Sequence, residues 1–225
     1  FFLNTNIYEI EKGRVYTDIV EHVAIIKDNL LLPKASYQQI DGELKSIDFN
    51  KVLDTGTPRL IKKVDGTMLS LVQGVSCENY FHFLFDVLAK LKIYEQLDSL
   101  KKIDFFYVHE ILDWQKKIFD LFEIHDSQLI SSKVYRHVRV KNIIAVEHPW
   151  YQKGFVQDEI INLPEWIVFW LREKFINLSK KFECSERIYI DRSDTKFNHC
   201  KIINNQEVIN YLKNVIYILF GQFFL

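Results

Sequence analysis

The sequence has little cysteine, glycine and proline, and it has no excess of charge of either sign. Its 225 residues include three Cys, seven Gly and four Pro, and the net charge is −1. Three cysteines without CxxC spacing argue against a disulfide scaffold and a zinc ribbon, and they favour a reducing compartment. The scarcity of Gly and Pro excludes collagen-like and linker-rich chains. The near-neutral charge argues against a dedicated nucleic-acid-binding protein.

Long hydrophobic runs are also missing. The most apolar stretch, NVIYILFGQFFL at 214–225, has twelve residues, whereas a helix needs about 20 to cross a bilayer. The start of the chain lacks the basic segment and long apolar segment of a signal peptide. Because the chain begins at Phe1 and stops inside an apolar run at Leu225, we expect it to be a fragment whose downstream sequence is missing.

What the sequence does contain is enough apolar surface for a folded core, at 48% hydrophobic and 15% aromatic residues. The first 75 residues have the pattern of strands. A turn at 27–29 predicts one hairpin, and Asp65-Gly66 between two apolar runs predicts a second. We therefore expect antiparallel hairpins in an N-terminal, β-rich subdomain over 1–75.

After Gly74, segments with helical periodicity alternate with short apolar runs. This alternation predicts an α/β fold with a Rossmann-like parallel sheet. We expect an α/β lobe over 76–160, and a linking helix with the start of a second lobe over 161–225. The predicted helices are 77–97, 111–124, 163–178 and 205–214, and the predicted strands are 102–108, 132–140, 142–148, 186–192 and 215–220.

A polar stripe on the first predicted helix is the most informative pattern. On a helix, His82 and Asp86 lie one turn apart on the same face, which Asn79 and Lys90 extend. The neighbouring positions are almost all apolar, so these polar groups must satisfy one another or line a cavity. An imidazole paired with a carboxylate can act as a general base.

Three other interpretations of this stripe stay open. The pair could simply tie a buried helix to its neighbours. It could contribute to a metal site, although the sequence identifies no third ligand and we expect none. It could serve a hydrolase, for which Ser76 or Cys77 would be the nucleophile, although no nucleophile-elbow motif supports one.

A second polar segment follows the predicted strand at 186–192. Arg192 lies where the strand ends and a polar loop begins, and in open α/β sheets ligands bind at the carboxyl ends of strands. Lys201 and Asn204 follow shortly before a predicted helix start. Arg, Lys and a helix start are all suited to a diphosphate, although Arg192 could equally form a surface salt bridge. Trp150 and Tyr151 lie in a predicted loop and could stack on a sugar.

Common cofactor and hydrolase signatures are absent from the sequence. It contains no GxGxxG, P-loop, GxSxG or HExxH motif, and no DxD pair that would hold a metal-bound nucleotide.

The two polar segments together resemble glycosyltransferase family 61, which includes enzymes of the capsular-polysaccharide type. The segment NYFHFLFDVLAKL fits the signature helix of the family, and the second segment fits the family's strand that ends in arginine and precedes a helix. The matching positions are Asn79, Tyr80, His82, Phe83, Asp86, Leu88 and Lys90 in the first segment, and Tyr189, Arg192, Ser193, Asp194, Asn204, Glu207 and Val208 in the second.

The resemblance implies a two-lobed, GT-B-like enzyme whose second Rossmann-like lobe is incomplete in this chain. Such an enzyme transfers a sugar with inversion from a nucleotide sugar to a glycan acceptor, in capsule or surface polysaccharide synthesis. It implies His82, Asp86 and Asn79 on the acceptor side and Arg192, Lys201 and Asn204 on the diphosphate.

The resemblance also implies that the nucleotide sugar is a substrate and that no further cofactor is needed. We expect a cytoplasmic protein without a membrane span and without a nucleic-acid partner, and a peripheral position at the inner membrane stays open. The alternative is a non-catalytic remnant or an interaction module of the same fold.

Overall fold

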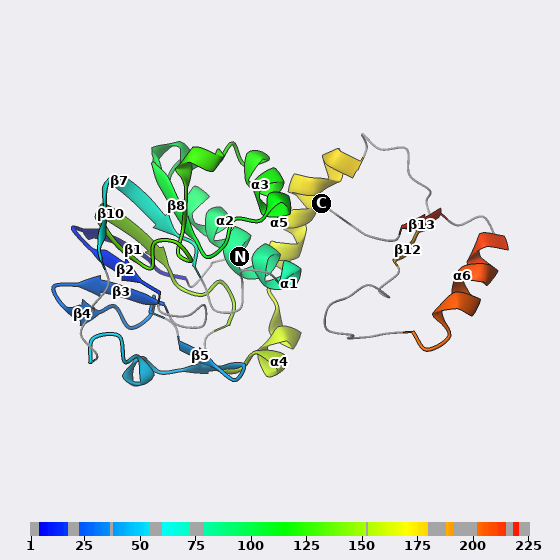
Figure 1. Cartoon of the computed structure of the whole chain (residues 1–225), viewed down its shortest axis with the longest axis horizontal. Coiled ribbons are helices and arrows are strands. Elements are labelled where there is room, and N and C mark those ends of the chain that lie inside the picture. Colours follow the sequence, from blue (N-terminus) through cyan, green and yellow to red (C-terminus); the bar gives the residue numbers. More distant parts are fainter. Residues whose placement is uncertain are drawn as a thin grey trace. The chain divides into compact units, whose positions relative to one another are not determined.

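The chain divides into two compact units, Phe1–Arg172 and Glu173–Leu225. The structure is a computed structural model, shown in Figure 1. It describes residues 5–17, 23–36, 38–54, 60–72, 79–151, 153–179, 188–190, 202–214 and 218–220.

The first unit is built on four parallel strands in the order β9-β8-β7-β10. In chain order, β7 comes first, β8 and β9 are added on one side of it, and β10 pairs with its other side. This is the 3-2-1-4 order of doubly wound sheets, so the predicted parallel α/β sheet is confirmed. The strands are β7 (Lys62–Ser70), β8 (Phe105–Val108), β9 (Leu129–Ser131) and β10 (His137–Val146).

Helices connect the first three of these strands, and Figure 1 shows them on one side of the sheet. The helix predicted over 77–97 is present as one continuous helix from Tyr80 to Glu95. The predicted helices over 111–124 and 163–178 are also confirmed. Their bounds are α1 (Tyr80–His82), the π-helical η3 (Phe83–Leu88), α2 (Ala89–Glu95), α3 (Asp113–Asp120) and α5 (Glu165–Ser179).

Antiparallel strands complete the sheet beyond β10. β1 and β2 pair along one edge of β10, and β3 and β4 extend the sheet beyond β2. The predicted hairpin at 27–29 is confirmed, because Asp28 and Asn29 adopt the positive φ values of a tight two-residue turn. Strands from both sides of the expected domain boundary at 75/76 therefore belong to one sheet. These strands are β1 (Ile7–Glu11), β2 (Arg14–Tyr16), β3 (Ala24–Lys27) and β4 (Leu30–Leu31).

The predicted hairpin at Asp65-Gly66 is wrong. Strand β7 runs straight through this dipeptide, and its pairing with β10 shifts register there, which makes the dipeptide a β-bulge. Gly66 has a φ of 147°, and a Cβ on it would lie 2.7 Å from Oδ2 of Asp104. That carboxylate accepts the N–H of Thr67, so the bulge is held by a side chain. The strands predicted over 132–140 and 142–148 join into the single β10, opposite this bulge.

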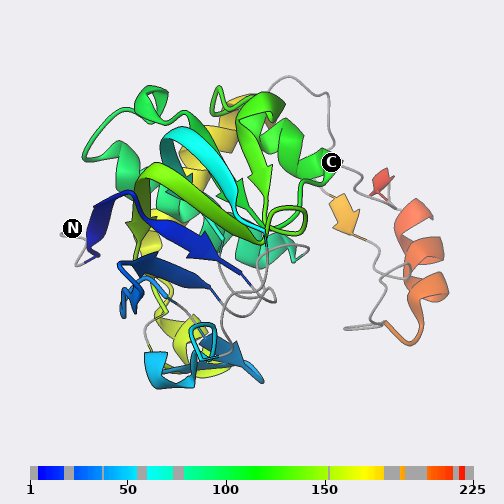
Figure 2. The same ribbon diagram turned by 60° about the vertical axis from the view of Figure 1, so that its left-hand side comes forward.

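A small second sheet lies beside the main one, next to α4, as Figures 1 and 2 show. It pairs β5 with β6, and β6 with β11, which follows the loop after β10. This pairing brings the β5–β6 hairpin next to that loop. The remaining elements are β5 (Gln38–Ile40), β6 (Glu43–Lys45), β11 (Gly154–Phe155), α4 (Val156–Glu159) and the short 3-10 turns Ile47–Phe49, Leu100–Lys102, Asp126–Gln128 and Ile160–Asn162.

The second unit contains a parallel strand–helix–strand arrangement. β12 (Ile188–Ile190) pairs in parallel with β13 (Ile218–Phe220), and α6 (Asn205–Asn214) connects them. This confirms the predicted strand, helix and strand. Within the described residues of both units, no helix combines the length and apolarity that a membrane crossing requires.

Candidate active site

The helix after β7 begins at Asn79, which acts as its N-cap. Oδ1 of Asn79 accepts the backbone N–H groups of Phe81 and His82, at 3.0 and 3.3 Å. These are two of the donors that the first turn of a helix leaves without a partner inside the helix. Asn79 therefore fixes where the helix begins, and its predicted role toward an acceptor stays a prediction.

His82 and Asp86 are in contact, as the helical spacing predicts. Nδ1 of His82 lies 2.8 Å from Oδ2 of Asp86, and their side chains are 14% and 5% exposed. The helix is wider here than expected, because Phe83–Leu88 has π geometry. Such turns are rare within α-helices and are frequent at functional sites.

A tryptophan from a distant part of the chain binds the second carboxylate oxygen. Nε1 of Trp150 donates to Oδ1 of Asp86 at 2.8 Å. Trp150 and Tyr151 are 8% and 1% exposed, so both rings face inward. The structure thus corrects the idea that these rings stack on a sugar, because they are already packed inside the protein.

The hydrogen bonds of Asp86 determine which nitrogen of His82 carries the proton. An ionised carboxylate only accepts hydrogen bonds, so Nδ1 of His82 must be the donor. Nε2 is then the basic nitrogen, with its lone pair free to accept a proton. Among the described residues nothing forms a hydrogen bond with Nε2. The pair therefore has the arrangement of a histidine base oriented by a buried carboxylate.

His148 lies behind Asp86 and is neutral. Its Nδ1 accepts the backbone N–H groups of Trp150 and Tyr151, at 3.3 and 2.9 Å, so its proton is on Nε2, 3.8 Å from Oδ2 of Asp86. Burial lowers the pKa of His148 to about 3, and the charges of Lys90 and His82 act in the same direction while that of Asp86 opposes them. His148 therefore holds the loop in place and does not titrate near neutral pH.

Lys90 is the fourth ionisable group of this cluster. It is 1% exposed, and its Nζ donates to the carbonyl of Val72 at 3.3 Å, just beyond the end of β7. Burial lowers the pKa of Lys90 to about 7, although the charge of Asp86 raises it. We call His82, Asp86, Lys90, His148 and Trp150 the Asp86 cluster.

The Asp86 cluster lies at the carboxyl ends of β7 and β10. Its first three members lie on the helix that follows β7, and the other two lie in the loop that follows β10. The strand order reverses between β7 and β10, because β8 follows on one side of β7 and β10 lies on the other. Ligands of open α/β sheets bind at this kind of switch point.

The second predicted group of residues lies in the second unit, where the structure describes only part of it. Arg192 and Lys201 lie outside the described residues, as do Ser76 and Cys77 in the first unit. Asn204 is exposed just before α6, and its Nδ2 donates to Glu207 at 3.3 Å. In the same unit, the hydroxyl group of Tyr189 donates to Oδ1 of Asn205. The predicted roles of Arg192, Lys201 and Asn204 stay predictions.

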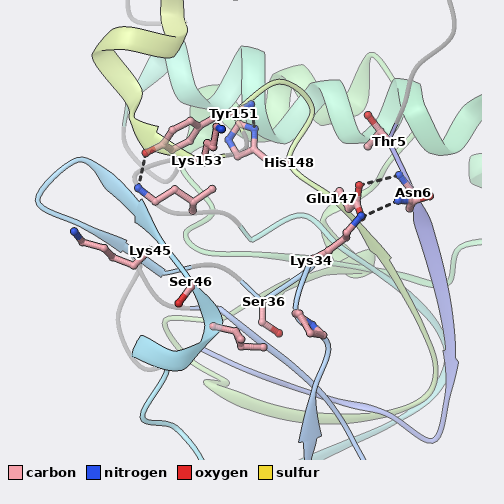
Figure 3. A pocket seen from close by; sticks show the side chains of 13 residues that line it. Thr5, Asn6, Lys34, Ser36, Lys45, Ser46, Glu147, His148, Tyr151 and Lys153 are labelled. Atoms are coloured by element: carbon pink, nitrogen blue, oxygen red, sulfur yellow. Dashed lines mark hydrogen bonds and ion pairs between the residues drawn. The ribbon is translucent and has the colours of Figure 1, made fainter.

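A cavity of about 840 Å³ adjoins the Asp86 cluster, and sequence reasoning missed it. We call it the lysine pocket. His148 contributes to its wall, next to Glu147 and Tyr151 of the same loop (Figure 3). The other walls come from β6 and the turn after it, from the residues just before β1, and from the segment that follows β4. The pocket is lined by Thr5, Asn6, Pro33, Lys34, Ser36, Leu44, Lys45, Ser46, Ile47, Glu147, His148, Tyr151 and Lys153.

Tyr151 joins the loop after β10 to the small sheet. Its hydroxyl group accepts the N–H of Leu44 at 2.6 Å and donates to the carbonyl of Gly154. Burial raises the pKa of Tyr151 to about 12, so it stays protonated. One loop therefore supplies Trp150 to the Asp86 cluster and Tyr151 to the pocket.

Within the described parts of the chain, no three His, Cys, Asp or Glu side chains are grouped as a metal site would require. A scan of the chain against models of protein families finds no match, and a search of the curated proteins finds no relative.

Proposed function

We propose that the protein is an inverting glycosyltransferase in which Nε2 of His82 accepts the proton of an acceptor hydroxyl group. The observation that carries the proposal is the contact of His82 with Asp86, which leaves Nε2 without a partner among the described residues at the switch point of the sheet. The resemblance of this helix to family 61 supports the choice of glycosyl transfer over other reactions that need a base.

In the proposed reaction, the acceptor oxygen attacks the anomeric carbon of a nucleotide sugar. Its proton passes to Nε2 of His82, and the bond between the anomeric carbon and the diphosphate oxygen breaks with its electron pair on the diphosphate. Asp86 does not touch the acceptor in this scheme, because both of its oxygens are engaged. It holds His82 in the required tautomer and stabilises the imidazolium ion that forms.

The donor side of the proposal comes from the second unit. Arg192, with Lys201 and Asn204, would bind the diphosphate and stabilise its growing negative charge. The GT-B architecture, the cytoplasmic or membrane-peripheral location and the role in surface polysaccharide synthesis belong to the same proposal.

The test is transfer by the product of the complete reading frame that encodes the chain, assayed as release of nucleoside diphosphate with a panel of nucleotide sugars and glycan acceptors. We expect His82→Ala and Asp86→Asn each to lower kcat by about 10²- to 10⁴-fold. Asparagine has the shape of aspartate, but its Nδ2 donates to Nδ1 of His82 and forces the proton onto Nε2.

Asp120→Asn is the matched control, because Asp120 is exposed at the end of α3. It should keep the activity of the unaltered protein. Normal turnover by the double variant His82→Ala, Asp86→Asn would reject the assignment of the base. If no donor in the panel stabilises the protein against heat and none is consumed, the interaction-module alternative is favoured instead.

A further inference from the structure

The lysine pocket concentrates positive charge in a protein that is almost neutral. Lys34, Lys45 and Lys153 line it, and among the described lining residues the only carboxylate is that of Glu147. The net charge of the whole chain is −1. The volume of about 840 Å³ falls within the range of roughly 300–1,000 Å³ that is usual for ligand-binding cavities.

The carboxylate of Glu147 forms its short contacts with neutral donors and not with the lysines. It accepts hydrogen bonds from the hydroxyl group of Tyr8 at 2.6 Å and from the side chain and backbone of Asn6 at 2.9 and 3.2 Å. Burial alone would raise the pKa of Glu147, but these bonds and the charge of Lys34 lower it. Glu147 is thus ionised and already bound by neutral donors on the wall of the pocket.

Two of the three ammonium groups are therefore available to a ligand. Lys34 forms only a long ion pair with Glu147, in which Nζ lies 3.8 Å from the carboxylate, and its side chain is 67% exposed, so Nζ can still reach a ligand. Lys153 is exposed and has no ion pair with any described residue. Lys45 differs, because it is paired with Glu43. An anion in the pocket can bind Lys34 and Lys153 without breaking a buried contact.

The other groups in the pocket suit hydroxyl groups better than flat apolar rings. Thr5, Asn6 and Ser46 add hydroxyl and amide groups to the lining. Among the described lining residues, the aromatic rings are those of Tyr151 and His148, which are 1% and 6% exposed and offer no face for stacking. Pro33, Leu44 and Ile47 add only aliphatic surface, so charge and hydrogen bonds are the specific contacts that the pocket offers a ligand.

We propose that the lysine pocket binds an oligosaccharide that carries negative charge, as a carboxylate or a phosphate group, with Lys34 and Lys153 as the groups that bind the anion. We identify this oligosaccharide as the acceptor of the transfer, and this identification rests on the proposed function. His148 connects the two sites, since it lines the pocket and its Nε2 lies 3.8 Å from Asp86.

Titration calorimetry at low salt tests this directly, with an oligogalacturonate, a phosphorylated oligosaccharide, a neutral malto-oligosaccharide and inorganic phosphate as probes. We expect the anionic sugars to bind and the neutral sugar to bind at least tenfold more weakly. The double variant Lys34→Ala, Lys153→Ala should weaken binding of the preferred sugar by about tenfold for each lysine. Comparison of the oligogalacturonate with the phosphorylated oligosaccharide shows whether the pocket prefers a carboxylate or a phosphate group.

The control is Lys63→Ala, Lys117→Ala, which removes the same charge from exposed lysines of the first unit outside the pocket, and which should leave binding unchanged. The proposal would be overturned if the neutral sugar or inorganic phosphate bound as tightly as the anionic sugars. It would also be overturned if the two double variants lost the same amount of affinity for the preferred sugar. If the unaltered protein binds the anionic sugar through these lysines but transfers no sugar to it from any donor, the proposed function fails while the binding of an anionic oligosaccharide stands.

Discussion

The Asp86 cluster and the lysine pocket share His148 and differ in how their polar groups are satisfied. In the cluster, both oxygens of Asp86 are bound by ring N–H groups, and its side chain is 5% exposed. In the pocket, the ammonium groups of Lys34 and Lys153 are exposed. The cluster fixes the orientation of one histidine, whereas the pocket leaves charges ready for a ligand.

The difference means that the same kind of substitution should affect the two regions in different ways. Removing a charge from the cluster leaves buried donors without a partner, which costs folding free energy. Removing an exposed charge from the pocket leaves no buried group without a partner, so it should change only the affinity for a ligand.

The largest effect should come from Asp86→Ala. It removes the acceptor of two buried donors, Nδ1 of His82 and Nε1 of Trp150. We expect the free energy of unfolding to fall by about 3 kcal/mol, measured by urea denaturation near pH 7. Asp120→Ala, at an exposed position of α3, should change it by less than about 0.5 kcal/mol. Equal effects of the two substitutions would show that the cluster does not stabilise the fold.

A smaller effect should appear on acidification. Burial holds the pKa of His148 at about 3 in the folded protein, whereas it is near 6.5 in the unfolded chain. Between these values the unfolded state binds a proton that the folded state does not. His148 therefore makes the free energy of unfolding fall with decreasing pH, by about 1 kcal/mol between pH 6 and pH 5.

The check on this prediction is His148→Asn, which keeps a polar side chain able to accept from the backbone of the loop. Other groups, including Glu147, also titrate at low pH, so the measured quantity is the difference between the two proteins at each pH. Between pH 6 and pH 5 we expect the free energy of unfolding of the unaltered protein to fall by about 1 kcal/mol more than that of the variant. Parallel stability curves would mean that His148 has an ordinary pKa in the folded state.

Local patterns in the sequence are enough to predict the contact of His82 with Asp86. The two residues are four apart on one helix, so the contact needs no knowledge of the rest of the fold. The same reasoning cannot find Trp150, which is 64 positions from Asp86. Its place follows only once β10 is known to lie next to β7. The available signal was that Trp150 follows a predicted strand, at the end where α/β sheets bind ligands.

Asp65-Gly66 shows a second limit of local reasoning. The dipeptide predicts a hairpin because Gly tolerates positive φ, and a β-bulge uses the same property. What decides between the two is whether the flanking runs pair with each other or with other strands. Here β8 and β10 pair with β7 on its two sides, so the strand continues. The turn at Asp28 and Asn29 is correct because β3 and β4 do pair with each other.

The smallest effect on stability should come from Lys153→Ala. Lys153 is exposed and pairs with no described carboxylate, so its removal should change the free energy of unfolding by less than about 0.5 kcal/mol. The same variant should bind the anionic oligosaccharide about tenfold more weakly, because the lost charge faces the ligand. Urea denaturation and calorimetry on one preparation measure both quantities. A loss of stability as large as that of Asp86→Ala would mean that Lys153 belongs to the folded framework, and the contrast between the two regions would then fail.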